Sequence, residues 1–171
     1  MGGLLDSFRP DMRARGLKDI DVEALHKQGF CGLLLDLDNT LLPWKDPILP
    51  EESESWIESA KQLGMKLCIV SNTHYPNRLT KIAEHLGIDA LARALKPRNY
   101  GFIKAAELID CELARCVVVG DQLLTDIWGG NRAGAFTILV NPMHPREFIG
   151  TKVSRMIERL IFAALKEPSR V

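Results

Sequence analysis

No stretch of the chain approaches the roughly 18 consecutive apolar residues that a membrane-spanning helix requires. The N-terminus, Met1 to Asp6, also lacks the basic-then-apolar pattern of a secretory signal peptide. Net charge is absent as well, because 22 Lys and Arg residues balance 22 Asp and Glu residues. A chain with no global positive field is not typical of a nucleic-acid binder. These absences predict a cytoplasmic protein without a nucleic-acid partner.

Cysteine is scarce, with four residues in the whole chain: Cys31, Cys68, Cys111 and Cys116. Cys31 and Cys68 fall in apolar runs that are typical of buried strands, where cysteine behaves as a small apolar side chain. Cys111 and Cys116 have no second Cys/His pair nearby, as a zinc site would require. We therefore expect four reduced thiols and no zinc site.

With 171 residues, 46% hydrophobic and 26% charged, the chain has the size and composition of an ordinary globular domain. We expect a single domain over residues 1–171. Its patterns predict a catalytic core over residues 30–143, an N-terminal segment over 1–29 and a basic amphipathic helix within 144–171.

Short apolar runs alternate along the chain with longer stretches of helical periodicity, separated by Gly and Pro. The apolar runs predict strands over residues 30–35, 66–70, 116–119 and 136–140, and the Ala-rich run 90–95 is an ambiguous fifth. The periodic stretches predict helices over residues 51–63, 77–86, 100–109 and 123–133. This alternation predicts an α/β fold: a doubly wound, mainly parallel sheet with helices on both faces.

Polar residues stand directly after each predicted strand, and the carboxyl ends of parallel strands meet at one edge of a sheet. The residues that this edge would collect are Asp36, Asp38, Ser71, Asn72, Lys96, Asp121 and Asp126. Two carboxylates about 4 Å apart repel each other by roughly 4 kcal/mol at an effective dielectric constant of 20. Such a cluster needs a cation, and hard oxygen ligands suit Mg²⁺.

A carboxylate beside Mg²⁺, a Lys and a Ser hydroxyl matches the needs of phosphoryl transfer, in which positive charge must surround the phosphoryl oxygens. An Asp can attack phosphorus to form an aspartyl-phosphate. A second Asp two residues further along the chain can give a proton to the leaving oxygen and later take one from water.

Taken in chain order, these segments resemble the four motifs of the haloacid dehalogenase superfamily phosphatases. Asp36-Leu37-Asp38-Asn39-Thr40 is similar to the first motif, Ser71 to the second, Lys96 to the third, and the segment from Gly120-Asp121 to Asp126 to the fourth. The resemblance implies that Asp36 is the nucleophile and Asp38 the general acid/base. It also implies that the phosphoryl group is bound by Ser71, Asn72 and Lys96.

The same resemblance implies a Mg²⁺ site made by Asp36, Asp121 and the backbone carbonyl of Asp38. Asp126 would be a supporting acid that acts through water or holds Lys96. Gln122 stands where many relatives have a second acid or a Ser, and this departure affects the surroundings of the metal rather than the chemistry.

A narrower resemblance is carried by two segments, Asp38-Asn39-Thr40-Leu41-Leu42 and Gly120-Asp121-Gln122-Leu123-Leu124-Thr125-Asp126. They are similar to the branch that contains the phosphatidylglycerophosphate phosphatases, which produce phosphatidylglycerol. The gaps between motifs are too short for a folded cap domain, as in the subclass III members that lack a large cap. The site should therefore be open, which suits a membrane-held substrate.

The neutral total charge is a cancellation between two segments. Residues 31–59 hold seven acids against Lys45, whereas residues 144–171 hold six bases against three acids. Within the second segment, Lys152 to Lys166 has apolar residues at helical spacing with basic residues between them. Such a helix can lie on an anionic bilayer at the inner face of the membrane, or it can pack on the sheet with its basic side in water.

Three other functions compete with a phospholipid phosphatase. One is a soluble phosphatase of the same family for a sugar phosphate, nucleotide or phosphopeptide. Another is a phosphoacceptor receiver module, which the second Asp of the first motif argues against, because a receiver protonates no leaving alcohol. The last is a noncatalytic interaction protein, which would have no use for the full set of acids and Lys. The oligomeric state is left open by the sequence.

Overall fold

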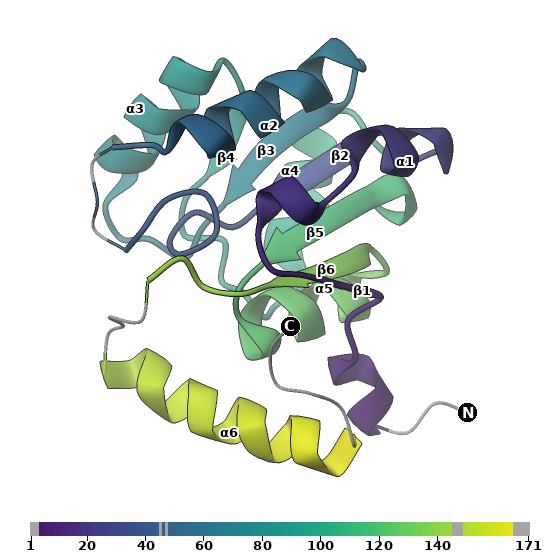
Figure 1. Ribbon diagram of the computed structural model, residues 1–171, viewed down its shortest axis with the longest axis vertical. Helices are drawn as coiled ribbons and strands as arrows, with labels where there is room; N and C mark the ends of the chain where they lie inside the picture. Colours follow the sequence, from purple (N-terminus) through teal and green to yellow (C-terminus); the bar gives the residue numbers. More distant parts are fainter. Residues whose placement is uncertain (1–3, 45, 47, 145–148, 166–171) are drawn as a thin grey trace.

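The computed structural model (Figure 1) describes residues 4–44, 46, 48–144 and 149–165. Its six strands form one sheet in the order β1-β6-β5-β2-β3-β4, and every neighbouring pair is parallel. The strands are β1 (Met12–Ala14), β2 (Gly32–Leu35), β3 (Lys66–Val70), β4 (Asp89–Leu91), β5 (Cys116–Gly120) and β6 (Phe136–Val140). The predicted α/β fold with a parallel, doubly wound sheet is confirmed.

Helices connect the strands and cover both faces of the sheet (Figure 1). They are α1 (Val22–Lys27), α2 (Glu51–Gln62), α3 (Pro76–Leu86), α4 (Tyr100–Leu108), α5 (Trp128–Ala133) and α6 (Ile149–Leu165). Shorter turns are the 3₁₀ segments η1 (Leu4–Phe8), η2 (Leu17–Asp19) and η3 (Leu113–Arg115), and the π-helical segment η4 (Leu123–Ile127). The helices predicted over 51–63, 77–86 and 100–109 are confirmed to within a residue at each end.

Two parts of the sheet differ from the sequence prediction. The run 90–95 is a strand only in β4, since Arg93 and Leu95 have positive φ and end the extended backbone. The segment 1–29 contributes β1, an edge strand of three residues that is too short to show an apolar pattern.

The predicted helix over 123–133 begins as η4, in which the carbonyl of Gln122 accepts from the N–H groups of Asp126 and Ile127.

The pleat of the strands sends alternate side chains into two cores. On one face, Leu33 and Leu35 of β2 pack with residues of α1, α2 and α3. On the other face, Leu34 packs with Phe102 of α4 and with Ala135 before β6. Because β2 is buried on both faces, it reads as a continuous apolar run in the sequence.

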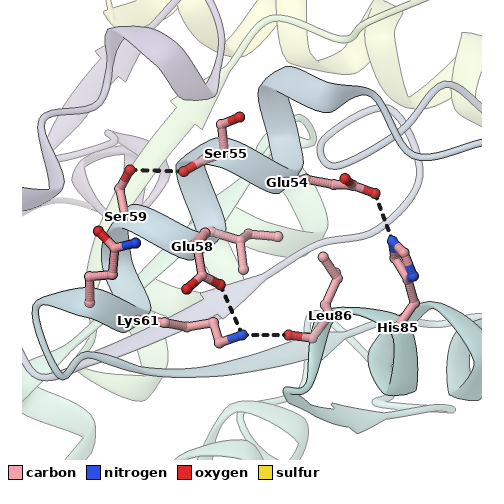
Figure 2. A pocket seen from close by; sticks show the side chains of 9 residues that line it. Glu54, Ser55, Glu58, Ser59, Lys61, His85 and Leu86 are labelled. Atoms are coloured by element: carbon pink, nitrogen blue, oxygen red, sulfur yellow. Dashed lines mark hydrogen bonds and ion pairs between the residues drawn. The ribbon is translucent and has the colours of Figure 1, made fainter.

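Polar side chains join α2 to α3 along one side of the molecule (Figure 2). His85 contacts Glu54 at 2.7 Å, and Lys61 donates to the backbone carbonyl of Leu86 at 3.0 Å. The hollow between these helices has a volume of about 530 Å³ and is lined mainly by exposed polar groups. None of the predicted site residues lines it, and we interpret it as a solvent-filled groove between two packed helices.

The expectation of four reduced thiols is wrong for one pair. Cys31, just before β2, and Cys111, just after α4, form a disulfide although 80 residues separate them in the chain. The sequence gives no sign that these two segments meet, because their approach depends on α4 packing across β2. Cys68 and Cys116 are free thiols, as predicted, and both are buried.

The C-terminal helix α6 lies along the lower edge of the view in Figure 1, and its inner side forms a third, smaller core. Phe162 packs there against Leu123, Ile127 and Leu139. The outward residues Met156, Ile157 and Leu160 are exposed. The basic positions Lys152, Arg155 and Lys166 of the predicted amphipathic pattern have side chains outside the described part of the structure. Among the described residues, no helix is long and apolar enough to cross a membrane.

Candidate active site

The predicted site residues gather where the chain reverses its direction of travel across the sheet. From β2 the chain proceeds to β3 and β4, and it later returns through β5 to β6 on the other side. The crevice between the carboxyl ends of β2 and β5 is thus a topological switch point, the usual ligand position in such sheets. Asp36 follows β2 and donates its N–H to Val119 of β5 at 2.9 Å, which holds it beside Asp121.

Lys96 is the centre of this cluster. Its ammonium group donates to Asp36 Oδ1 and to Asp126 Oδ1, both at 2.6 Å. Its side chain is 3% exposed, against 11% for Asp36 and 1% for Asp126. Asp126 also accepts the N–H of Gln122 at 3.1 Å through Oδ2. Lys96 is thereby held in one position, with its charge directed at Asp36.

The tight approach of Asp126 depends on a glycine. A Cβ atom on Gly120 would overlap the carboxylate of Asp126, so only glycine at the end of β5 lets this carboxylate reach Lys96. This explains in physical terms why glycine precedes Asp121 in the fourth motif.

Burial and charge act against each other on the two central groups. Burial raises the pKa of Asp36 to about 7, and Asp126 and Asp38 add to the shift, while Lys96 opposes it. Burial lowers the pKa of the Lys96 ammonium group. The neighbouring carboxylates of Asp126 and Asp36 together have the larger effect, so the pKa is raised overall. Lys96 therefore stays charged, and Asp36 is a carboxyl that would gain from a further cation.

The donor set at this point fits a metal ion. Carboxylate oxygens of Asp36, Asp121 and Asp126 lie within 4.8 Å of one another. Asp126 already uses both oxygens, one for Lys96 and one for Gln122, whereas Asp36 Oδ2 is buried and has no hydrogen-bond partner. A buried carboxylate oxygen of this kind is costly unless something satisfies it. Asp36 and Asp121 are consequently the side chains placed to hold a hard divalent cation.

Asp38 is positioned by a tight loop after Asp36. Asn39 has a φ of 66°, a left-handed conformation that Asn tolerates better than most residues. Its N–H donates to Leu42, and its side chain accepts the N–H of Trp44 at 3.3 Å. The loop turns Asp38 toward the open side of the crevice, where its side chain is 29% exposed.

Ser71 and Asn72 follow β3 on the other side of Asp36. Ser71 is buried, and its Oγ accepts the N–H of Thr73 at 3.1 Å, which leaves its own O–H to donate. The Asn72 side chain was predicted to bind the phosphoryl group, but in the structure it contacts the backbone of Lys96. Its side chain donates to the carbonyl of Lys96 at 2.9 Å and accepts the N–H of Lys96 at 2.8 Å. The Asn72 side chain therefore fastens the Lys96 backbone to the end of β3.

These side chains open into a pocket of about 660 Å³. Its floor is formed by Asp36, Asp38, Ser71 and Lys96, and its walls by Trp44, Asn72, Thr73, His74, Tyr75, Arg78, Gln122 and Thr125. In the described residues, the segments between the motifs contain loops, helices of the fold and β4, with no cap domain over the opening. The predicted open site is consistent with this arrangement.

Two further residues of the site were not predicted from the sequence. Arg78, in the first turn of α3, donates from Nη1 to Asp38 Oδ1 at 2.7 Å. Glu158 of α6 is buried and accepts the N–H of Leu123 at 2.8 Å, next to the fourth motif. A signal existed only for Arg78, since the first turn of a helix after a carboxyl-end loop faces the site. Nothing in the spacing connects Glu158 with a segment 35 residues earlier.

Residues 40–134 match the haloacid dehalogenase-like hydrolases, and the chain belongs to this family. It is a phosphatase of this family, and the part of the chain that the structure describes contains no large cap. Over 164 residues it is 38% identical to the probable phosphatase YqeG of Bacillus subtilis, with 96% of this chain and 95% of that protein covered.

Two further relatives are the phosphatidylglycerophosphate phosphatases 1 of Arabidopsis thaliana and Chlamydomonas reinhardtii. Each is 30% identical over 166 residues, which cover 92% of this chain. The chain spans 47% of the plant protein and 62% of the algal one.

Solved structures agree on the fold. An uncharacterized protein from Listeria monocytogenes is 20% identical, with a TM-score of 0.55 over 78% of this chain and 99% of that chain. The cobalt-bound deoxy-D-mannose-octulosonate 8-phosphate phosphatase of Haemophilus influenzae has a TM-score of 0.55 at 14% identity, over 80% of this chain and 90% of that chain. At these identities, both similarities show the fold alone.

Proposed function

We propose that this phosphatase is a Mg²⁺-dependent phosphomonoesterase that removes the terminal phosphate of phosphatidylglycerophosphate at a membrane surface. One observation carries the chemistry: Asp36, with 11% of its side chain exposed, is held by Lys96 on one oxygen and has a second, buried oxygen without a partner, at the floor of an open pocket. The substrate rests on the two relatives whose names state that activity and on the apolar surface described below.

The reaction follows from the positions of these side chains. A carboxylate oxygen of Asp36 attacks phosphorus, a P–O bond forms, and the bond from phosphorus to the substrate alcohol breaks. Asp38 gives a proton to the departing alkoxide and takes one from the water that next attacks phosphorus. Phosphate leaves, and Asp36 and Asp38 return to their starting forms. Lys96 and the Ser71 hydroxyl bind the phosphoryl oxygens throughout.

A Mg²⁺ ion would be held by Asp36 and Asp121, with the Asp38 carbonyl as the third protein ligand that the family resemblance implies. When bound, it supplies positive charge to the phosphoryl oxygens. The charges of the site support a divalent ion. When all four are ionised, the carboxylates of Asp36, Asp38, Asp121 and Asp126 exceed the two cations, Lys96 and Arg78, by two charges.

Exposed apolar side chains stand on the loops that carry or adjoin the site residues, and they favour a lipid substrate. On the loops after the strands, Ile48 is 73% exposed, Tyr75 77% and Leu95 51%. Met143 belongs with them, since its N–H donates to the carbonyl of Asn39 at 3.0 Å. Large apolar groups exposed together are typical of a surface that meets another molecule or a membrane.

Helix α6, which packs on η4 beside the fourth motif, also exposes apolar side chains. Met156 is 60% exposed and Leu160 65%, one helical turn apart, while Phe162 and Glu158 point into the protein. An amphipathic helix with its apolar side outward can lie in the interface of a bilayer. We propose that α6 and these loops both contact anionic lipid.

The substrate assignment is tested by phosphate release from phosphatidylglycerophosphate in mixed micelles, beside glycerol 3-phosphate, a sugar phosphate and a nucleotide. We expect kcat/KM for the lipid to exceed that for every soluble ester. A preference for a soluble ester would instead identify the protein as a soluble phosphatase with the same chemistry.

Leu160→Glu is expected to weaken binding to anionic vesicles by roughly tenfold or more, because it places a charge where an apolar side chain would enter the bilayer. Vesicle co-sedimentation measures the effect. Leu108→Glu is the matched control, since Leu108 is also exposed, at 52%, but lies at the far end of α4. Equal binding by both variants and the unmodified chain would exclude α6 from the contact. Point variants are preferable to truncation, which would remove the buried Phe162.

Stabilisation by Mg²⁺ is expected to depend on pH because the pKa of Asp36 is raised from 3.8 to about 7. In the metal-free protein this shift contributes stability that is complete below the ordinary pKa and is lost as the pH rises to about 7. Mg²⁺ must displace that proton, so the rise in Tm on adding Mg²⁺ should grow up to about pH 7 and then level off. A thermal shift series from about pH 5 to pH 8 measures this, and a rise independent of pH would contradict it.

A further inference from the structure

Arg78 is the one residue of the pocket wall whose charge the proposed chemistry does not use. It stands in the first turn of α3 and connects two loops of the mouth. Nη1 donates to Asp38 Oδ1 at 2.7 Å, and Nη2 donates to the carbonyl of Asp46 at 3.0 Å. Its Nε is buried and has no hydrogen-bond partner. The guanidinium group, which has five N–H donors, is thus only partly satisfied within the protein.

The position of Arg78 distinguishes it from Lys96. Lys96 is enclosed between two carboxylates, with 3% of its side chain exposed, and it faces the reacting phosphoryl group. The side chain of Arg78 is 28% exposed and reaches the same pocket further out. Of the residues that line the pocket, these two carry a permanent positive charge. A substrate with one anionic group at the floor and another further out would find a cation at both levels.

We propose that Arg78 binds a second anionic group of the substrate, a phosphodiester separated from the reacting phosphate by a short polyol. This rests on the proposed function, because phosphatidylglycerophosphate has such a group between its glycerol and its diacylglycerol. Guanidinium suits this task, since its planar N–H groups pair with two oxygens of a phosphate at once. Arg78 would then determine which phosphomonoesters are turned over well, in addition to contacting Asp38.

The test compares two lipids in identical mixed micelles. Phosphatidylglycerophosphate has the second phosphate, and phosphatidic acid is a diacyl phosphomonoester that lacks it. For Arg78→Ala, we expect kcat/KM on phosphatidylglycerophosphate to fall about 10- to 100-fold further than kcat/KM on phosphatidic acid, mainly through KM. Arg78→Lys should lose less than Arg78→Ala, since it keeps the charge. Lys81→Ala, on the same helix but away from the pocket, is the control and should change neither.

Each outcome separates the two proposals. If the unmodified protein prefers phosphatidylglycerophosphate and Arg78→Ala slows both lipids equally, Arg78 only positions Asp38, and the second anion site is wrong while the substrate stands. If the unmodified protein shows no preference for phosphatidylglycerophosphate over phosphatidic acid, the substrate assignment and the role of Arg78 are both overturned. Circular dichroism and Tm of each variant establish that it is folded.

Discussion

Asp36→Asn should lower kcat on the order of 10⁴-fold or more, because an amide oxygen does not attack phosphorus and no covalent intermediate can form. The substitution should leave the fold intact. Asn has the size of Asp, and its carbonyl oxygen can still accept the hydrogen bond from Lys96, which is 2.6 Å from Asp36 Oδ1. The measurement is phosphate release under saturating substrate, with Tm as the check on folding.

Asp110→Asn is the matched control for this variant. The Asp110 side chain is 99% exposed and pairs with Lys66, at the opposite end of the sheet. We expect unchanged kcat for this control. Near-normal turnover by Asp36→Asn would contradict the assignment of the nucleophile, as would a phosphorylated residue other than Asp36 detected by mass spectrometry after rapid acid quench.

Lys96→Met should have the largest effect on stability, lowering the free energy of unfolding of the metal-free protein by about 3–5 kcal/mol. The reason is the pair of carboxylates that Lys96 joins. Without the ammonium group, Asp36 and Asp126 would be buried together with no cation between them, and Asp126 is 1% exposed. We also expect phosphatase activity to be lost, since the phosphoryl group loses its fixed positive charge.

Urea denaturation with and without Mg²⁺ measures this effect. Mg²⁺ should restore part of the lost stability, because a cation bound at Asp36 neutralises one of the two carboxylates that Lys96 no longer pairs with. Lys104→Met is the control: Lys104 pairs with Glu107 at 2.7 Å, but both side chains are about half exposed. A surface pair of this kind contributes about 0–1 kcal/mol. Equal destabilisation by the two variants would contradict the central role of Lys96.

The parallel sheet could be predicted from the sequence because its central strands are buried on both faces. A strand such as β2, with Leu33, Leu34 and Leu35 all inaccessible to solvent, must be apolar at every position. Edge strands are under no such constraint. This is why β1 left no pattern in the sequence, and why β4 is shorter than the Ala-rich run that suggested it.

In the site, likewise, the positions of the residues could be predicted from the sequence, whereas their contacts could not. Asp36, Ser71, Lys96 and Asp121 each follow a strand closely in the chain, so a predicted strand is enough to place them at one edge. Their contacts could not be predicted in this way. That Asn72 fastens the Lys96 backbone, rather than extending toward the pocket floor, depends on the distance between the ends of β3 and β4.

By itself, the sequence determined the order of the elements, the sheet edge that holds the site and the residues with the chemistry of phosphoryl transfer. These properties depend on local patterns: apolar runs, helical periodicity and the residue that follows each strand. Contacts between distant segments were decided only by the tertiary structure. It joins Cys31 to Cys111, Glu158 to Leu123 and Arg78 to Asp38. Such pairs form because packed elements bring their side chains together, and a local pattern indicates at most which edge of the sheet a residue faces, not the partner that it meets.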